Sequence, residues 1–271
     1  MTTAVKAGRC VHCLGAYPEE EMTEDHVPPR AWYPNTTPSS VQYWKIPCCN
    51  KCNRDLARIE RDLLIRFGLC VDPARPETSG LVPKALRTIV LDAGRLSDEE
   101  QGHRDRTRAR IRRELMLYDD ISEAAVRGLC APDGVPPGAL ALPIAYADLS
   151  RIAEKMARGF EYKRSGRFVE PPYSLRTFIG DPSGFTTDSS KLLSEISGEE
   201  CQFDLGPGFK IKYVFSPEHP SNIGYWFLLW GTFCLSVLIT REDALRASDP
   251  RFSKPKGLTR EDIVRNRKFP T

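Results

Sequence analysis

The segments Cys10-Val-His-Cys13 and Cys49-Asn-Lys-Cys52 decide how the first part of this 271-residue chain folds. Each contains two cysteines separated by two residues, and 35 residues lie between the two segments. Two such pairs can supply four thiolates to one tetrahedral metal site, and thiolates favour Zn²⁺ over Mg²⁺. Four protein ligands leave no open position on the ion. We therefore expect Cys10, Cys13, Cys49 and Cys52 to hold a structural zinc ion.

Two further residues lie beside or within these cysteine pairs. Cys48 directly precedes Cys49 and could replace it as a ligand, although the spacing of two residues favours Cys49. We expect Cys48 to be a small buried neighbour of the site. His12 lies between the first two cysteines, and we expect its side chain to be exposed. The alternative is that His12 tunes the properties of the zinc site.

Composition and charge narrow the class of protein. Nine cysteines are an odd number and too few for a disulfide scaffold of this length. The first ten residues contain no apolar run that would suggest a signal peptide, so we expect a cytoplasmic protein, in which clustered cysteines bind metal. The formal net charge is only +3, so any binding of nucleic acid must depend on a local site.

A second motif lies between the cysteine pairs, in the segment Thr23-Glu-Asp-His-Val-Pro-Pro-Arg30, and Asn53 directly follows the last cysteine. The order C-x2-C, D-H-V-P-P and I-P-x-C-x2-C-N resembles the HNH endonucleases, in the variant with four zinc cysteines. The resemblance is strong over about 50 residues. It implies a ββα-metal fold for the zinc-bound part of the chain.

The resemblance also implies the roles of individual residues. His26 corresponds to the general base that takes a proton from the attacking water, and Asp25 and Asn53 correspond to the ligands of one catalytic Mg²⁺ or Mn²⁺. Gln42, seven residues before the third cysteine, stands on the expected second strand where the family has an asparagine. Gln keeps the carboxamide but adds a methylene, so the hydrogen bonds that orient His26 should differ from those of the family.

This chemistry has a physical basis beside the resemblance. Hydrolysis of a phosphodiester needs a base near neutral pH, which imidazole supplies, and a hard cation with oxygen ligands to offset negative charge. Neighbouring residues of a strand point to opposite faces. Asp25 and His26 can therefore face the same site only if the strand ends or has a bulge at this point. Pro28 and Pro29 follow at once and favour a strand end.

Apolar residues recur at helical spacing after Asn53 and predict the helix of the ββα unit. These residues are Leu56, Ile59, Leu63 and Phe67. Glu60 lies two turns after Asn53, so we expect it near the cation, with a surface salt bridge as an equal alternative. Four arginines are predicted to contact phosphates, with a purely solvated role of similar weight. They are Arg30, Arg54, Arg58 and Arg61.

The rest of the chain contains a proline-rich segment, an arginine-rich segment and a region with a helix and strands. Residues 71–84 are rich in proline and read as a linker or surface loop, and an arginine-rich segment follows in which Arg106, Arg110 and Arg113 would share one face of a helix. That face is expected to be solvated, with phosphate binding as the alternative. Leu149, Ile152, Met156 and Phe160 predict a helix, and 174–180 and 209–215 predict strands.

The apolar segment 225–240 has 16 residues. A helix that spans a membrane needs about 20 residues, so this segment is too short. It predicts two buried strands, or one long strand bent at Gly231. The fold class that follows is α+β, with an N-terminal zinc-stapled ββα-metal (HNH) domain, a helical linker region and a C-terminal α+β domain. The corresponding boundaries are 1–70, 71–137, 138–248 and a basic tail at 249–271.

The expected function is that of a metal-dependent HNH endonuclease that cuts DNA, with RNA as the alternative substrate. A role in defence against foreign DNA follows by family analogy alone. The C-terminal domain would bind a protein partner or select the substrate, a homodimer would allow both strands to be cut, and no membrane is involved. The alternative is a catalytically inactive, zinc-stabilised module that binds nucleic acid or protein. Gln42 favours this alternative, whereas Asp25, His26 and Asn53 favour the enzyme.

Overall fold

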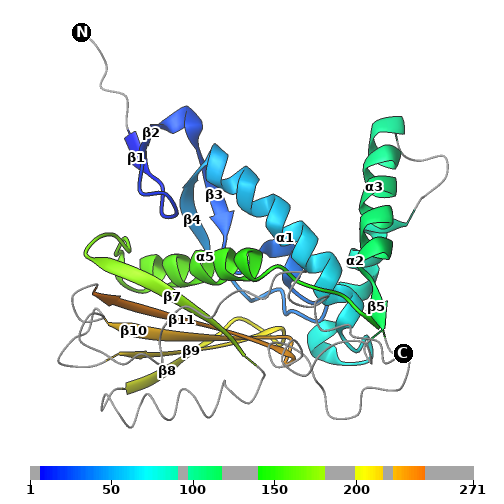
Figure 1. Ribbon diagram of the computed structural model, residues 1–271. Coiled ribbons are helices and arrows are strands. Elements are labelled where there is room, and N and C mark those ends of the chain that lie inside the picture. Colours follow the sequence, from blue (N-terminus) through cyan, green and yellow to red (C-terminus); the bar gives the residue numbers. More distant parts are fainter. Residues whose placement is uncertain (1–6, 91–96, 118–139, 181–198, 216–221, 242–271) are drawn as a thin grey trace, which may run out of the picture.

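The computed structural model describes residues 7–90, 97–117, 140–180, 199–215 and 222–241. It contains both helices and strands, as the α+β prediction requires (Figure 1). The helices are α1 (Asn50–Cys70), α2 (Leu81–Ile89), α3 (Asp98–Glu114) and α5 (Tyr146–Ser165). The strands of the N-terminal half are β1 (Ala7–Arg9), β2 (Ala16–Pro18), β3 (Met22–His26), β4 (Lys45–Cys49) and β5 (Met116–Leu117). Those that follow are β6 (Leu140–Ala141), β7 (Tyr173–Gly180), β8 (Glu199–Asp204), β9 (Phe209–Phe215), β10 (Ile223–Leu229) and β11 (Phe233–Arg241).

The N-terminal part has the order strand, strand, helix that the sequence predicts. Strands β3 and β4 pair antiparallel, and α1 begins directly after β4. The first cysteine pair lies in the turn region between the paired strands β1 and β2. All four apolar residues that predict the helix are buried in α1, namely Leu56, Ile59, Leu63 and Phe67. The helix prediction is therefore confirmed.

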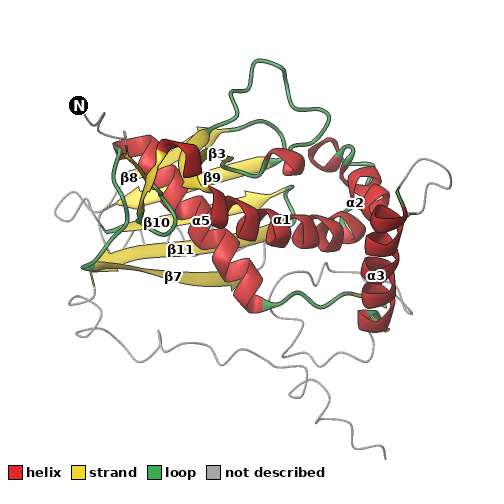
Figure 2. Ribbon diagram, turned by 90° about the horizontal axis from the view of Figure 1, so that it is seen from above, coloured by secondary structure: helices red, strands yellow, loops and turns green. Residues whose placement is uncertain are grey.

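The C-terminal part is a five-stranded antiparallel sheet in the order β7-β11-β10-β9-β8. Helix α5 lies on one face of this sheet, and α1 packs beside α5 (Figure 2). Gly166, with φ of 70°, ends α5, because glycine adopts this left-handed conformation at little cost. The segment 225–240 forms the two strands β10 and β11, joined by a turn in which Gly231 has φ of 65°. None of the described helices combines the length and the apolar character that crossing a membrane requires.

One hydrophobic core connects the N-terminal part, which carries the two cysteine pairs, with the sheet. Trp32 follows β3, Phe67 belongs to α1 and Trp230 lies at the end of β10, and their rings are 5.4 to 5.7 Å apart. The indole nitrogen of Trp230 also donates a hydrogen bond to the backbone oxygen of Trp32, at 2.9 Å. The two parts of the chain are thus packed together without a layer of solvent, while the expected division at residue 70 stays a prediction.

Two expectations about the secondary structure are wrong. Gln42 was expected on the second strand, but β4 begins at Lys45 and Gln42 is exposed in the preceding loop. The reason is that the backbone N–H of Val27 makes the last hydrogen bond of the hairpin, to Trp44 at 2.9 Å, and the next residue, Pro28, has no N–H to extend it. Residues 81–84, expected in a linker, begin α2. The expected tail at 249–271 lies outside the described residues.

Gly159 sets how closely α5 approaches the loop after His26. A Cβ atom at this position would lie 2.6 Å from Cγ2 of the buried residue Val27. Gly159→Ala should therefore lower the free energy of unfolding by about 1–3 kcal/mol, since a tightly packed core does not accept an added methyl group. Chemical denaturation measures this change.

A second helical glycine provides the control for this experiment. In α3, a Cβ at Gly102 would meet only the end of the Arg106 side chain, at 3.4 Å. Gly102→Ala should be neutral or stabilising by up to about 1 kcal/mol, because alanine favours the helix. Equal effects of the two substitutions would show that the contact with Val27 is not tight.

Candidate metal centre and surrounding residues

Four cysteines form a cluster that matches a tetrahedral metal site. The Sγ atoms of Cys10, Cys13, Cys49 and Cys52 all lie within 4.8 Å of one another. Cys13 Sγ and Cys49 Sγ are 3.9 Å apart. A zinc ion with Zn–S bonds of about 2.3 Å would place its sulfurs about 3.8 Å apart, so the cluster has the dimensions that zinc requires. Cys49, and not Cys48, belongs to this set.

The surroundings of the cluster favour thiolate ligands. Cys49 is the N-cap of α1, and its sulfur accepts a hydrogen bond from the backbone N–H of Cys52 at 3.4 Å. The positive end of the helix dipole stabilises negative charge there. The Tyr17 hydroxyl lies 3.3 Å from the sulfur of Cys13. A hydrogen bond with Cys48 lowers the pKa of Cys10 to about 3 and raises that of Cys48, so Cys48 stays a protonated neighbour.

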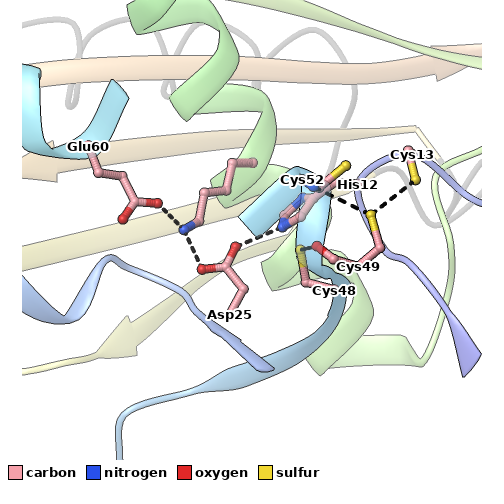
Figure 3. A network of polar contacts seen from close by, with 8 residues as sticks. His12, Cys13, Asp25, Cys48, Cys49, Cys52 and Glu60 are labelled. Carbon is pink, nitrogen blue, oxygen red and sulfur yellow. Dashed lines mark hydrogen bonds and ion pairs between the residues drawn. The ribbon is translucent and has the colours of Figure 1, made fainter. Parts of the chain in front are cut away.

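Asp25, the expected cation ligand, is buried and has both carboxylate oxygens occupied (Figure 3). Oδ2 lies 2.8 Å from Nε2 of His12, and Oδ1 accepts from Nζ of Lys155 at 2.7 Å. The side chain of His12 is only 7 % exposed, so the expectation that it is exposed is wrong. Its inward position follows from its hydrogen bond to Asp25.

Lys155 connects three elements in the interior. Its side chain has no exposed surface, and it forms ion pairs with Asp25 of β3 and with Glu60 of α1. Glu60 is 18 % exposed at its side chain, so its ion pair is internal and differs from the surface salt bridge that was one expectation. We call Asp25, Lys155, Glu60 and His12 the lysine cluster.

The pKa values of the two acids in the lysine cluster are shifted in opposite directions. Burial alone would raise the pKa of Asp25, but the hydrogen bond from His12 and the positive charge of Lys155 outweigh it and lower that pKa. For Glu60 the effect of burial exceeds the attraction of Lys155, and the pKa is raised. The charged form of Asp25 is therefore stabilised more strongly than that of Glu60.

His26 lies on the other face of the hairpin. The ladder of β3 and β4 is regular up to its last pair, His26 with Lys45, so Asp25 and His26 point to opposite faces. The half-buried imidazole makes no hydrogen bond to another described residue. Burial and the positive charges of Lys45 and Arg30 lower the pKa of His26. The ring is thus neutral near pH 7.

The other expected site residues are spread along α1 and the loop before it. Asn53 is half-buried in the first turn of α1 and makes no side-chain hydrogen bond to another described residue. The four arginines predicted to contact phosphates are all exposed, and two of them line a cavity beside α3. Those two are Arg58 and Arg61, whereas Arg30 and Arg54 line neither of the two described cavities.

Sequence reasoning missed Lys155. A signal for it exists, because Lys155 lies between Ile152 and Gly159 on the apolar face of α5, where a lysine needs a buried partner. Comparisons with known proteins add no further information, since no protein-family model, curated protein or solved structure matches the chain. The residues themselves define a mixed helix and sheet protein with a cysteine cluster fitted to a metal ion such as zinc.

Proposed function

We propose that the chain is a metal-dependent endonuclease of the HNH class that hydrolyses phosphodiester bonds of DNA. The observation that carries the proposal is the state of His26: its imidazole has no hydrogen-bond partner among the described residues, and its pKa is lowered beside Lys45 and Arg30. A neutral imidazole can take a proton from water. Lys45 is already paired with Glu24 at 2.6 Å, so Arg30 is the neighbouring cation that can attract the phosphate.

The proposal assigns a catalytic Mg²⁺ or Mn²⁺ to Asp25 and Asn53, whose oxygens suit a hard cation. When bound, such an ion would stabilise the negative charge that develops on the departing 3′ oxygen. Both oxygens of Asp25 already have partners, so binding there requires that Lys155 leave Asp25 and keep its ion pair with Glu60. Because Asp25 and His26 point to opposite faces of the hairpin, the mechanism also requires that the end of β3 turn the imidazole toward the ion. The zinc cluster then has the structural role of fixing β4 and the start of α1.

A zinc-stabilised binding module is the second candidate, and the ion pair between Lys155 and Asp25 favours it. Here the lysine cluster serves only to hold α5 against α1 and β3. An ammonium group beside the carboxylate repels a second cation, which is the physical argument against the enzyme. This candidate predicts binding of nucleic acid or protein without cleavage.

Supercoiled plasmid incubated with Mg²⁺ or Mn²⁺ tests the proposal. His26→Ala should reduce the rate of nicking by about 10²–10⁴-fold, because general base catalysis contributes this much. The pKa of His26 lies below its usual value of 6.5, so the rate should rise with pH only below that value and stay constant above pH 7. Plasmid cleavage followed on gels over a range of pH values measures both.

The folded state of the variant is checked by its zinc content and its unfolding midpoint. Nicking by His26→Ala at the wild-type rate would remove His26 from the mechanism. A wild-type protein that binds DNA or RNA and cuts neither would establish the binding module instead.

A further inference from the structure

Two cavities adjoin each other between α1, α2 and α3. Figure 2 shows how these three helices are arranged. The first has a volume of about 450 Å³ and lies between α1 and α3, and the second has about 640 Å³ and extends along α2. Arg61, Thr88 and His103 line both cavities, so the two form one continuous hollow. We call this hollow the arginine cleft. Its volume is that of a ligand-binding pocket.

The arginine cleft has an excess of positive charge. Seven lysine and arginine side chains line it against three carboxylates, although the whole chain carries only +3. The carboxylate of Asp62 is already shared by Arg66 and Arg110, and that of Glu100 caps α3 through Ser97. Four of the arginines make no ion pair or hydrogen bond to another described residue, and these are Arg58, Arg61, Arg87 and Arg106.

The position of α3 brings these arginines together. Ile111 is the one residue of α3 that is buried, and the helix is held to α1 by ion pairs. Arg66 of α1 contacts Glu114 at 2.6 Å, and Arg110 of α3 contacts Asp62. Arg58 and Arg61 of α1 therefore face Arg106 of α3 across the cleft. Unpaired like charges in one hollow repel each other, and an anionic ligand removes that repulsion.

We propose that the arginine cleft binds the phosphate backbone of a nucleic acid. Guanidinium groups bind phosphate through two parallel hydrogen bonds, and the four unpaired arginines of the cleft supply such groups. Among the described lining residues there is no Phe, Tyr or Trp on which a base could stack, so the cleft contacts the backbone without regard to sequence. The choice of nucleic acid over a free phosphorylated compound rests on the proposed nuclease function.

The test compares the binding of a fluorescent 20-base-pair duplex by four full-length, zinc-containing proteins. All carry His26→Ala, which prevents cleavage. One has no further change, one carries Arg61→Gln with Arg106→Gln, and one carries Lys51→Gln with Arg112→Gln. Lys51 and Arg112 are exposed on α1 and α3 and line neither cavity, so the third protein loses the same charge from the same helices. The fourth carries all four changes.

The cleft variant should bind the duplex at least about tenfold more weakly, and the slope of log Kd against log salt should fall by about 2, since each phosphate contact contributes about 0.9. The Kd of the control variant should stay within about twofold of that of the protein with His26→Ala alone. The protein that carries all four further changes should bind the duplex as weakly as the cleft variant. Equal weakening of the cleft and control variants would show a general effect of charge and overturn the proposal.

ATP and inorganic triphosphate serve as competitors. Binding of these compounds that depends on the cleft, without binding of the duplex that depends on it, would overturn the assignment to nucleic acid. If the wild type never nicks plasmid but duplex binding depends on Arg61 and Arg106, the nuclease proposal fails and the arginine cleft stands.

Discussion

Cys49→Ser should abolish zinc binding, whereas Cys48→Ser should leave one zinc ion per chain. The sulfur of Cys49 belongs to the four-cysteine cluster and also caps α1, while Cys48 is its protonated neighbour. A structural zinc site contributes about 10–16 kcal/mol of binding free energy that becomes folding free energy. We therefore expect Cys49→Ser to unfold the segment from β1 to the start of α1. Metal analysis of the purified proteins and circular dichroism measure the two effects.

The two substitutions form a matched pair, because they exchange the same atoms at adjacent buried positions. Retention of zinc by Cys49→Ser together with its loss in Cys48→Ser would show that Cys48 is the fourth ligand. Stable folding of both variants without any metal would remove the structural role of the cluster.

Lys155→Met should lower the free energy of unfolding by about 3–5 kcal/mol, the usual effect of removing one partner from a buried ion pair. The substitution preserves the length of the side chain but leaves Asp25 and Glu60 facing each other without a cation. Denaturation in urea measures the change. Lys163→Met provides the control, because Lys163 is exposed on the same helix and its replacement should cost less than about 0.5 kcal/mol.

The lysine cluster also predicts a rescue. Adding Glu60→Gln to Lys155→Met removes one of the two repelling carboxylates, so the double variant should be more stable than the sum of the two single effects predicts. Asp25 would keep its hydrogen bond with His12 in that variant. Strict additivity of the two substitutions would show that Lys155 and Glu60 do not act as a pair.

Local patterns in the sequence predict much of this structure. The cysteine spacing predicts the four members of the cluster, and apolar periodicity predicts α1 and α5. The aromatic and β-branched residues of 225–240 predict either two buried strands or one bent strand, and the structure has the two strands β10 and β11. These features depend on residues close together in the chain or on the geometry of one metal ion. The candidate residues Asp25, His26 and Asn53 are identified by the resemblance of their motif to the HNH endonucleases, and their roles stay predictions.

The contacts that local patterns miss join distant segments. Lys155 and Asp25 are 130 residues apart, and no periodicity shows which carboxylate a buried lysine will meet. The arginines of α1 and α3 converge only because Arg66 and Glu114, 48 residues apart, hold the two helices together. Gln42 was misplaced for a related reason, since the end of the hairpin depends on one cross-strand hydrogen bond at Val27.

The ring contacts of Trp32 and Phe67 with Trp230 have a consequence for how the chain could be divided or recombined. A fragment that ends after α1 would expose two large aromatic side chains that are completely buried in the whole chain. Such a fragment would associate or aggregate even with its zinc bound, because the apolar surface loses its cover. The N-terminal part with its cysteine cluster is therefore not an exchangeable unit, and any chimera would need a new second half with a complementary apolar surface.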